Sequence, residues 1–364
     1  MSVTPTSACK LAGTMSQLPP ITIIYSSEEA ANRLVAGIPA AARSLATLAR
    51  QHGAIERAGV AVPGGWTPSA FCLAEARRLT PQLTWAAVDL TKEPHNQVVI
   101  GAELLAGIAK AAPQAGLSDQ MHPERELQLL GRASRVIIKA TGKPADGIVS
   151  RHINRPISQA ITRRLLRWSW PRPGHATAAA ALLGIAMLVA LLLGGSTGLL
   201  AGAVLFQAAS IIDGVDGEMA RATFRSSQRG AMLDSLTDTA TNLGFLAGVS
   251  CNVWQEGAMG AAMAGLLGLV VLASGSAILA LAARRAGGPF TFDALKHRFR
   301  ERPSRVKQAL VYITMRDFYA LAACIAILSG AARPLLYVFA TVACGWFAVL
   351  CFTFASGGFA RIRG

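Results

Sequence analysis

Residues 173–212 have the sequence PGHATAAAALLGIAMLVALLLGGSTGLLAGAVLFQAASII, which contains 40 residues without Asp, Glu, Lys or Arg. One crossing of a bilayer takes about 20 residues. The stretch therefore predicts two transmembrane helices that turn at residues 194–197. Soluble domains carry about 25% charged residues, whereas only 15% of this chain is charged and its mean hydropathy is +0.41. An ordinary water-soluble globule is excluded.

Four more apolar segments follow this stretch, and with the first two helices they predict six transmembrane helices. They are residues 231–253, 257–283, 318–332 and 334–360. The segment 231–253 is apolar except for Asp234 and Asp238, and the segment 318–332 must borrow flanking residues to cross a bilayer. The expected fold is a polytopic α-helical membrane protein with an N-terminal cytoplasmic α/β domain.

Basic residues indicate the orientation of the chain. The net charge is +15, and residues 151–364 hold 21 Lys/Arg against 9 Asp/Glu. The Lys/Arg residues lie on alternate connections, while the opposite connections hold only Arg333. By the positive-inside rule, both termini are expected in the cytoplasm and the protein in the cell inner membrane. Nucleic acid is not an expected partner, because the basic half of the chain is also its apolar half.

Residues 151–170 mix Ile, Leu and Trp with Arg at helical spacing. They are typical of an interfacial helix on an anionic leaflet, which makes membrane lipids an expected partner. A plain cytoplasmic linker helix is the alternative. The chain begins without a basic segment followed by an apolar run, so no signal peptide is expected. Its six cysteines form no CxxC pair, which argues against a disulfide framework or a zinc site.

The first 150 residues differ from the rest. Short apolar runs at residues 21–25, 58–62, 85–89 and 134–138 predict strands, and residues 28–52 predict a helix between the first two. Alternating strands and helices favour a mostly parallel sheet. The expected domains are a flexible N-terminus at 1–20, an α/β domain at 21–145, an interfacial helix or linker at 146–172, and the membrane domain at 173–364.

Four aspartates lie where two predicted membrane helices meet the cytoplasm. Asp213 and Asp216 are spaced i, i+3 at the end of the second helix, and Asp234 and Asp238 are spaced i, i+4 at the start of the third. Each pair shares a helix face, so the four carboxylates can converge. Oxygen ligands suit Mg²⁺ or Mn²⁺, and two such ions would form a clamp for phosphoryl transfer. A cation site in a transporter or a structural ion cluster is the alternative.

The residues around these aspartates resemble the signature of the CDP-alcohol phosphatidyltransferase family, D-x2-D-G-x2-A-R-x8-G-x3-D-x3-D. Every fixed position matches: Asp213, Asp216, Gly217, Ala220, Arg221, Gly230, Asp234 and Asp238. The resemblance implies a membrane enzyme that replaces CMP on a CDP-alcohol with an acceptor hydroxyl.

The resemblance also assigns roles to these residues. It implies that the four aspartates hold two divalent metals and that Asp238 is the base. It further implies that Gly217, Ala220, Arg221 and Gly230 bind the CDP portion. The family often has Pro-Asn-x-x-Thr at the start of its first helix. This chain keeps Pro173 and Thr177 but lacks the Asn, so Thr177 is the nucleotide contact that remains.

The acceptor site is expected on the basic loop 284–316. Arg316, with Arg305 or Lys307, is placed to hold a phosphate on the acceptor, although these charges also suit topology alone. The donor is CDP-diacylglycerol or a CDP-polyol, and the acceptor is a polyol, a polyol phosphate or a lipid alcohol. A homodimer is expected. A non-enzymatic transporter or scaffold with a structural cation site is the competing function.

Two short segments narrow the resemblance. Residues 154–158, Asn-Arg-Pro-Ile-Ser, and residues 316–319, Arg-Asp-Phe-Tyr, are similar to bifunctional inositol-1-phosphate cytidylyltransferase/di-myo-inositol-phosphate phosphate synthases. The α/β domain then resembles a nucleotidyltransferase. Residues 25–31 follow the first strand and contain two acids but no glycine, where a triphosphate-binding loop would need glycines. We interpret this domain as degenerate and kept for regulation, docking or stability.

Overall fold

The computed structural model describes residues 21–51, 55–89, 97–107, 122–144, 146–285 and 315–355. The chain forms two compact units. The α/β unit comprises residues 1–140, 163–170 and 222–224, and the helical unit comprises residues 141–162, 171–221 and 225–364. Two later segments, residues 163–170 and 222–224, thus belong to the α/β unit, and the expected domain boundaries stay a prediction.

The α/β unit is built on a four-stranded sheet in the order β5-β4-β1-β6, in which all neighbours are parallel. The strands are β1 (Thr22–Ile24), β4 (Arg57–Ala61), β5 (Thr84–Val88) and β6 (Val98–Ile100). A hairpin of β2 (Leu34–Val35) and β3 (Ile38–Pro39) stands apart from the sheet. The side chains of Ile23 and Val60, which face each other in register, are fully buried.

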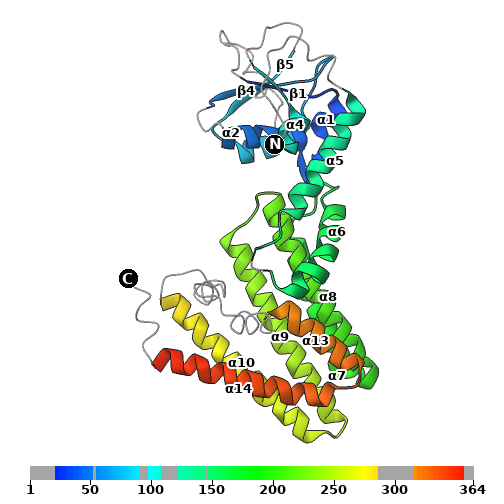
Figure 1. The fold of residues 1–364 in the computed structure, drawn as a ribbon, viewed down its shortest axis with the longest axis vertical. Coiled ribbons are helices and arrows are strands. Elements are labelled where there is room, and N and C mark those ends of the chain that lie inside the picture. The colour runs from blue at the N-terminus through cyan, green and yellow to red at the C-terminus, as the bar shows by residue number, and fades with distance from the viewer. Residues whose placement is uncertain are drawn as a thin grey trace, which may run out of the picture. The chain divides into compact units, whose positions relative to one another are not determined.

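Helices of the α/β unit lie on one face of this sheet (Figure 1). They include α1 (Glu28–Asn32), α2 (Ala40–Gln51), α4 (Gly101–Ala106) and α5 (Pro123–Lys139), and the unit also contains α3 (Ala70–Leu79). The phenol of Tyr25, at the end of β1, is hydrogen-bonded to Ser44 of α2 at 2.7 Å. A Cβ at Gly101 would overlap the Tyr25 ring, so only glycine allows α4 to begin this close to β1.

The expected strands at 21–25, 58–62 and 85–89 are confirmed by β1, β4 and β5. The strand expected at 134–138 is wrong, because these residues end helix α5. Glu126, Leu130 and Ala133 are buried at helical spacing along one face of α5, and this period outweighs the local run of β-branched residues. The fourth strand is β6, a three-residue segment too short to stand out in the sequence.

The single helix expected over residues 28–52 is also wrong within the described residues. Helix α1 ends at Asn32, and the hairpin of β2 and β3 separates it from α2. Ala36 and Gly37 have φ angles of 47° and 84°, in the left-handed region that interrupts a helix. Residue 52 lies outside the described part of the chain.

Arg43 of α2 is a buried cation of the α/β unit, with 3% of its surface exposed. Its guanidinium donates hydrogen bonds to the carbonyl of Ala36 at 3.2 Å and to that of Ala222 at 2.5 Å, and it lies over the ring of Phe224. The backbone of Phe224 has φ 54°, which is strained for an aromatic residue. Arg43 therefore stabilises a turn that has little stability of its own.

We expect Arg43→Met to lower the stability of the α/β unit by about 1–3 kcal/mol, because two buried carbonyls lose their charged donor. Thermal unfolding of the purified protein in detergent measures this effect. Arg57→Met, which removes an exposed cation from β4, is the matched control and should leave the midpoint unchanged. Equal midpoints for both variants would contradict a structural role for Arg43.

The helical unit contains most of the remaining helices. After a π-helical turn, η3 (Ser150–Asn154), they are α6 (Arg155–Leu165), α7 (Pro173–Leu193), α8 (Gly195–Ala222), α9 (Gln228–Gln255), α10 (Met259–Arg285), α13 (Arg316–Leu328) and α14 (Ala332–Ala355). The last residues of α6, 163–165, and of α8, Ala222, belong to the α/β unit. Each of the six predicted apolar segments contains one of the helices α7, α8, α9, α10, α13 and α14, and residues 356–360 of the last segment lie outside the described part of the chain.

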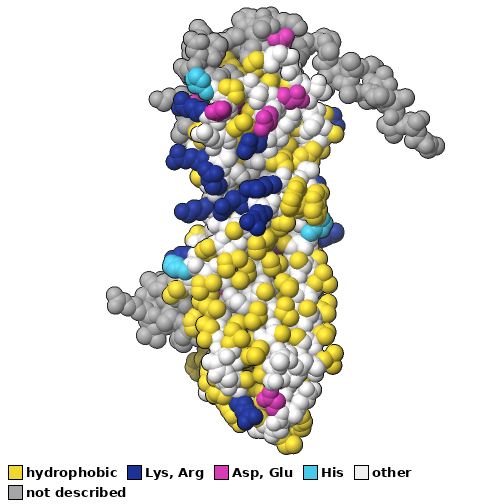
Figure 2. Space-filling model, turned by 90° about the vertical axis from the view of Figure 1, so that its right-hand side faces the viewer, with side chains coloured by type: hydrophobic (Ala, Val, Ile, Leu, Met, Phe, Trp, Pro, Cys, Tyr) yellow, Lys and Arg dark blue, Asp and Glu magenta, His cyan; other side chains and the backbone are white. Residues whose placement is uncertain are grey.

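Four of these helices, α7, α8, α10 and α14, are long and apolar enough to span a membrane. Helix α9 carries aspartates, and the 13 residues of α13 extend only about 20 Å, less than a bilayer core of about 30 Å. Figure 2 shows an outer surface of the helical unit covered by hydrophobic side chains. Leu182, Ile185 and Val189 of α7 are among the exposed hydrophobic residues of this unit. The protein is thus a membrane protein, while six crossings stay a prediction.

Small residues and aromatic rings hold the helices together. Phe206 of α8 stacks on Phe245 of α9 with ring centroids 3.9 Å apart. A Cβ at Gly248 of α9 would lie 2.7 Å from the Cβ of Leu191 in α7, so glycine permits this close crossing. Buried Asn252 donates to the carbonyls of Leu191 and Gly195, both at 2.9 Å, and closes the corner between α7 and α8. These contacts fix α8 and α9, the two helices that carry the aspartates.

Candidate functional site

Three of the four aspartates converge at one place. Ligand oxygens of Asp213 from α8 and of Asp234 and Asp238 from α9 all lie within 4.8 Å of one another. Helix α9 begins at this point because the side chain of Ser227 accepts a hydrogen bond from the backbone N–H of Gly230 at 3.0 Å, which is an N-cap. The cap sets the phase of α9, so that Asp234 and Asp238 face α8.

This cluster fits a divalent cation. Its ligands are carboxylate oxygens only, which hard cations such as Mg²⁺ and Mn²⁺ prefer. The Oδ1 atom of Asp234 is buried and has no hydrogen-bond partner among the described residues. A buried carboxylate oxygen without a partner is costly, and a bound cation would satisfy it. The geometry therefore supports a metal site on Asp213, Asp234 and Asp238.

Asp216 lies outside this three-residue cluster. Its side chain is buried and accepts a hydrogen bond from the Thr177 hydroxyl at 2.7 Å. Thr177 belongs to the first turns of α7, and its hydroxyl also reaches back to the carbonyl of Pro173. Helix α7 is thus joined to α8, which carries the signature. The contact comes from residues 173–177 of α7, a segment in which this chain lacks the family's Asn.

Gly217 and Arg221 lie one turn apart on the same face of α8. Nε of Arg221 donates to the carbonyl of Thr141 at 2.7 Å, which fixes the guanidinium. A Cβ at Gly217 would lie 3.0 Å from Nη1 of Arg221, so a side chain there would press on the guanidinium. Ala220, which precedes Arg221 on α8, is half-buried, and Gly230 is the exposed residue that donates to the N-cap of α9.

Arg316 is the expected acceptor residue that the structure places at the aspartates. It is the first residue of α13, and its Nη1 lies 3.2 Å from Oδ1 of Asp213 and also contacts Oδ1 of Asp238. Only 13% of the Arg316 side chain is exposed. Arg305 and Lys307 lie outside the described residues.

Glu218 is a residue at this site that the sequence reasoning missed. Its side chain is fully buried and accepts hydrogen bonds from Ser158 at 2.6 Å, Thr162 at 2.7 Å and Arg155 at 3.0 Å. The three donors lie on α6, so Glu218 ties that helix to α8. The i, i+4 spacing of Ser158 and Thr162 was the available signal, although it names no partner.

Arg155 continues this network to Asp146. Its guanidinium donates to both carboxylate oxygens of Asp146, at 2.8 and 3.0 Å. Burial alone would raise the pKa of Asp146, but the hydrogen bonds and charge of Arg155 outweigh it and hold that pKa below its ordinary value. The ion pair therefore contributes full stability above about pH 3.8, and this contribution is lost as the pH falls below that value.

One of the two short segments that resemble one subfamily contacts the turn that precedes the other. Oδ2 of Asp317, next to Arg316, accepts a hydrogen bond from the backbone N–H of Ser150 at 2.7 Å. Ser150 begins the π-helical turn η3, which leads directly into Arg155 and Pro156 of α6. π-Helical turns are rare and frequently lie at functional sites. The pairing orients the start of α13, and hence Arg316, beside the aspartates.

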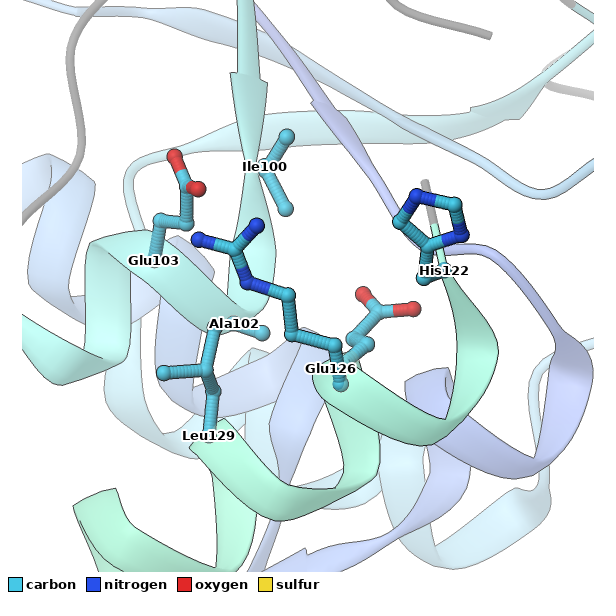
Figure 3. Close-up of a pocket in the computed structure, with 7 residues that line it drawn as sticks. Ile100, Ala102, Glu103, His122, Glu126 and Leu129 are labelled. Carbon is cyan, nitrogen blue, oxygen red and sulfur yellow. The ribbon is translucent and has the colours of Figure 1, made fainter. Parts of the chain in front are cut away.

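A pocket of the α/β unit lies at the carboxyl end of β6, and Figure 3 shows Glu103, His122 and Glu126 around it. Its lining residues are Ile100, Ala102, Glu103, His122, Arg125, Glu126 and Leu129. Glu126 accepts hydrogen bonds from the backbone N–H of Ser26, at 2.7 Å, and from its hydroxyl. Burial raises the pKa of Glu126 despite these hydrogen bonds. An acidic group therefore occupies the loop after β1.

Comparison with known proteins matches residues 172–352 to the CDP-alcohol phosphatidyltransferase family. The chain is 32% identical over 211 residues to a bifunctional IPC transferase and DIPP synthase of Thermococcus kodakarensis, covering 55% of this chain and 43% of the relative. Proteins of the same description from Aquifex aeolicus and Rubrobacter xylanophilus are 35% identical over 123 residues and 39% identical over 131 residues. These matches cover 34% and 35% of this chain, and 27% and 28% of the respective relatives. The chain thus spans less than half the length of the relatives it matches.

Proposed function

Because residues 172–352 of this chain belong to the CDP-alcohol phosphatidyltransferase family, we propose that the protein transfers a phospho-alcohol group from a CDP-alcohol to an acceptor hydroxyl and releases CMP. One observation carries the proposal. Asp213, Asp234 and Asp238, three of the signature aspartates, converge from two helices on a common point. A signature match alone would not require this convergence.

Two divalent ions, Mg²⁺ or Mn²⁺, are the proposed cofactors. Asp213, Asp234 and Asp238 would hold them, with Asp216 as a further ligand once its carboxylate turns from Thr177. Bound there, the ions would supply positive charge for the phosphates of the donor. Asp216 already lies on the same face of α8 as Asp213, one turn further along the helix.

Proton transfer and binding of the CDP portion are assigned to side chains of this protein. Asp238 is proposed as the base that takes the proton of the acceptor hydroxyl, because a hydroxyl is a poor nucleophile until it loses that proton. The acceptor oxygen then attacks the β-phosphorus, and CMP leaves. The guanidinium of Arg221, fixed by Thr141, is positioned to donate to phosphate oxygens. Gly217, Ala220, Gly230 and Thr177 are proposed to form the rest of the CDP site.

The substrates are proposed by chemical class. The donor is CDP-diacylglycerol or a CDP-polyol, and the acceptor is a polyol, a polyol phosphate or a lipid alcohol. The relatives' description as IPC transferase and DIPP synthase supports a CDP-polyol as the donor and a polyol phosphate as the acceptor. Arg316, with Arg305 or Lys307, would bind the acceptor phosphate. We also propose a homodimer in the inner membrane with both termini in the cytoplasm.

Membrane lipid is proposed to contact residues 163–170, which form the last turn of α6 and the segment after it. Arg163, Arg164 and Arg167 are exposed there, and the exposed rings of Trp168 and Trp170 stack with centroids 6.5 Å apart. Arginine beside exposed tryptophan is typical of a surface that lies on anionic headgroups. This segment supports the interfacial role expected for residues 151–170.

The α/β unit is proposed to lack nucleotidyltransferase activity. Ligands of open parallel sheets bind at the carboxyl ends of the strands, where the strand order reverses. In this sheet the reversal lies between β1 and β6, and there the N–H of Ser26 is occupied by Glu126. A triphosphate would meet the carboxylates of Glu103 and Glu126 instead of free N–H donors. Incubation with CTP and inositol phosphate should release no diphosphate, and release would contradict this proposal.

The test of the main proposal is an assay of the purified full chain in detergent. With Mg²⁺ or Mn²⁺, one CDP-alcohol and one acceptor of the classes above, we expect CMP release that stops when EDTA is added. Each donor should be tested with each acceptor. Metal-dependent ion flux in liposomes without CMP release from any pair would instead favour the competing transporter, and neither flux nor CMP would favour a scaffold.

A further inference from the structure

We propose that Arg316 is an internal counter-ion of the metal site, which neutralises the aspartates before metal binds and is displaced by the incoming cations. This inference rests on the proposed function, because it concerns the same three carboxylates. It goes beyond that function by assigning Arg316 an ion pair with two of the proposed metal ligands. Metal binding and the position of this side chain are then coupled.

The contacts of Arg316 are those of a counter-ion. Its Nη1 lies 3.2 Å from Oδ1 of Asp213 and also contacts Oδ1 of Asp238, so one nitrogen bridges helices α8 and α9. Asp234, the third member of the cluster, has no ion pair among the described residues, and its Oδ1 is buried without a partner. One guanidinium therefore offsets only part of the negative charge of the three carboxylates, and a bound cation would offset the rest.

The position of Arg316 on its helix points the same way. It is the first residue of α13, where the partial positive charge of the helix N-terminus disfavours a cation. Its Nε is buried and has no hydrogen-bond partner within the described part of the chain. The position of the Arg316 side chain is therefore stabilised mainly by its contacts with the two carboxylates. If these contacts were lost, the side chain would be free to move away.

The helix can stay in place while the side chain moves. Asp317, the next residue, accepts the N–H of Ser150 at 2.7 Å and anchors the first turn of α13 independently of Arg316. The long arginine side chain can thus leave the aspartates without unfolding the turn. It would carry its planar donors toward a neighbouring anionic group, such as a substrate phosphate.

Arg316 and the metals exclude each other at these oxygens. Mg²⁺ binds carboxylate oxygens at about 2.0–2.1 Å and requires their lone pairs. A cation on Oδ1 of Asp213 and Asp238 would then lie beside the guanidinium that contacts the same two atoms. Repulsion between like charges forces one of them out, and divalent ions carry the greater charge.

Binding of Mn²⁺ to the substrate-free full chain tests this inference, measured by electron paramagnetic resonance or calorimetry in detergent. Arg316→Gln removes the competing charge but keeps a side chain of similar length. We expect it to bind Mn²⁺ about tenfold more tightly than the wild type. Its thermal midpoint without metal should fall, while saturating Mn²⁺ should narrow the difference from the wild type. Arg333→Gln, at an exposed arginine of α14, is the matched control and should change neither quantity.

Unchanged or weaker Mn²⁺ binding by Arg316→Gln, with normal binding by the wild type, would overturn the inference and leave the proposed function intact. Absence of Mn²⁺ binding in both proteins would overturn the inference and the proposed metal site together. Binding by Arg316→Gln alone would support the inference in its strongest form, since the guanidinium would then block the site.

Discussion

Asp238→Asn is expected to lower CMP release by about 10²–10⁴-fold while the protein still inserts into the membrane and folds. General-base catalysis typically contributes a factor of this size. Asn keeps the shape of the side chain and one oxygen, but it cannot take a proton from the acceptor hydroxyl. The variant also removes one negative charge from a cluster whose ligand oxygens lie within 4.8 Å of one another, so it should not destabilise the metal-free fold.

CMP release under saturating metal, donor and acceptor measures this loss, and thermal unfolding in detergent checks the fold. Glu256→Gln is the matched control, because Glu256 is an exposed acid at the other end of the same helix. It should retain wild-type activity. Full activity of Asp238→Asn would remove Asp238 as the base. Equal losses in both variants would point to a general effect of charge on α9.

Asp234→Asn separates metal binding from proton transfer. Asp234 has no ion pair with Arg316 among the described residues, so its substitution leaves the contacts of Arg316 to Asp213 and Asp238 in place. Because Asp238 is also a proposed metal ligand, both variants should bind Mn²⁺ more weakly, and a larger loss of affinity in Asp234→Asn than in Asp238→Asn would support different roles for the two aspartates. The metal titration is the same as the one used for Arg316.

Local periodicity predicted much of the architecture. Predominantly apolar stretches predicted the helices α7, α8, α9, α10, α13 and α14 of the helical unit, because a lipid-facing helix must be apolar over most of its length. The strand assigned to 134–138 failed because five residues of Ser-Arg-Val-Ile-Ile suit a strand as well as a helix. The burial of Leu130 and Ala133, which decides for a helix, depends on contacts distant in sequence.

Some contacts of the candidate site could likewise be predicted from the sequence, and others could not. The i, i+4 spacing of Asp234 and Asp238 sets their common face, so their approach to Asp213 could be predicted from the chain. The partner of Asp216 is Thr177, 39 residues earlier, and Glu218 meets hydroxyls 56 and 60 residues earlier. No periodicity links such positions. Arg316 was predicted as an acceptor ligand, but its ion pairs with Asp213 and Asp238 depend on how α13 packs.

The ion-pair network between α6 and α8 gives the largest expected effect on stability. Arg155→Met is expected to destabilise the helical unit by about 3–5 kcal/mol, the typical cost of leaving a buried charge without its partner. Glu218 is fully buried, and without Arg155 its hydrogen-bond donors among the described residues are the hydroxyls of Ser158 and Thr162. Asp146 loses both of its hydrogen bonds from the guanidinium as well. Thermal unfolding in detergent measures the loss, and Arg164→Met, at an exposed arginine of the same helix, should change nothing.

A second variant distinguishes the uncompensated charge from a mere loss of packing. In Arg155→Met/Glu218→Met both buried charges are gone, and apolar replacement of a buried ion pair is often neutral or stabilising. The double variant should therefore recover most of the stability that Arg155→Met loses, although Asp146 stays without Arg155. The single variant Glu218→Met completes the comparison. If the double variant loses as much stability as Arg155→Met and Glu218→Met added together, the two charges do not act as a pair. Glu218 lies five residues after Asp213 on α8, so recovery of stability without recovery of CMP release would show that the α6–α8 network also positions the aspartates.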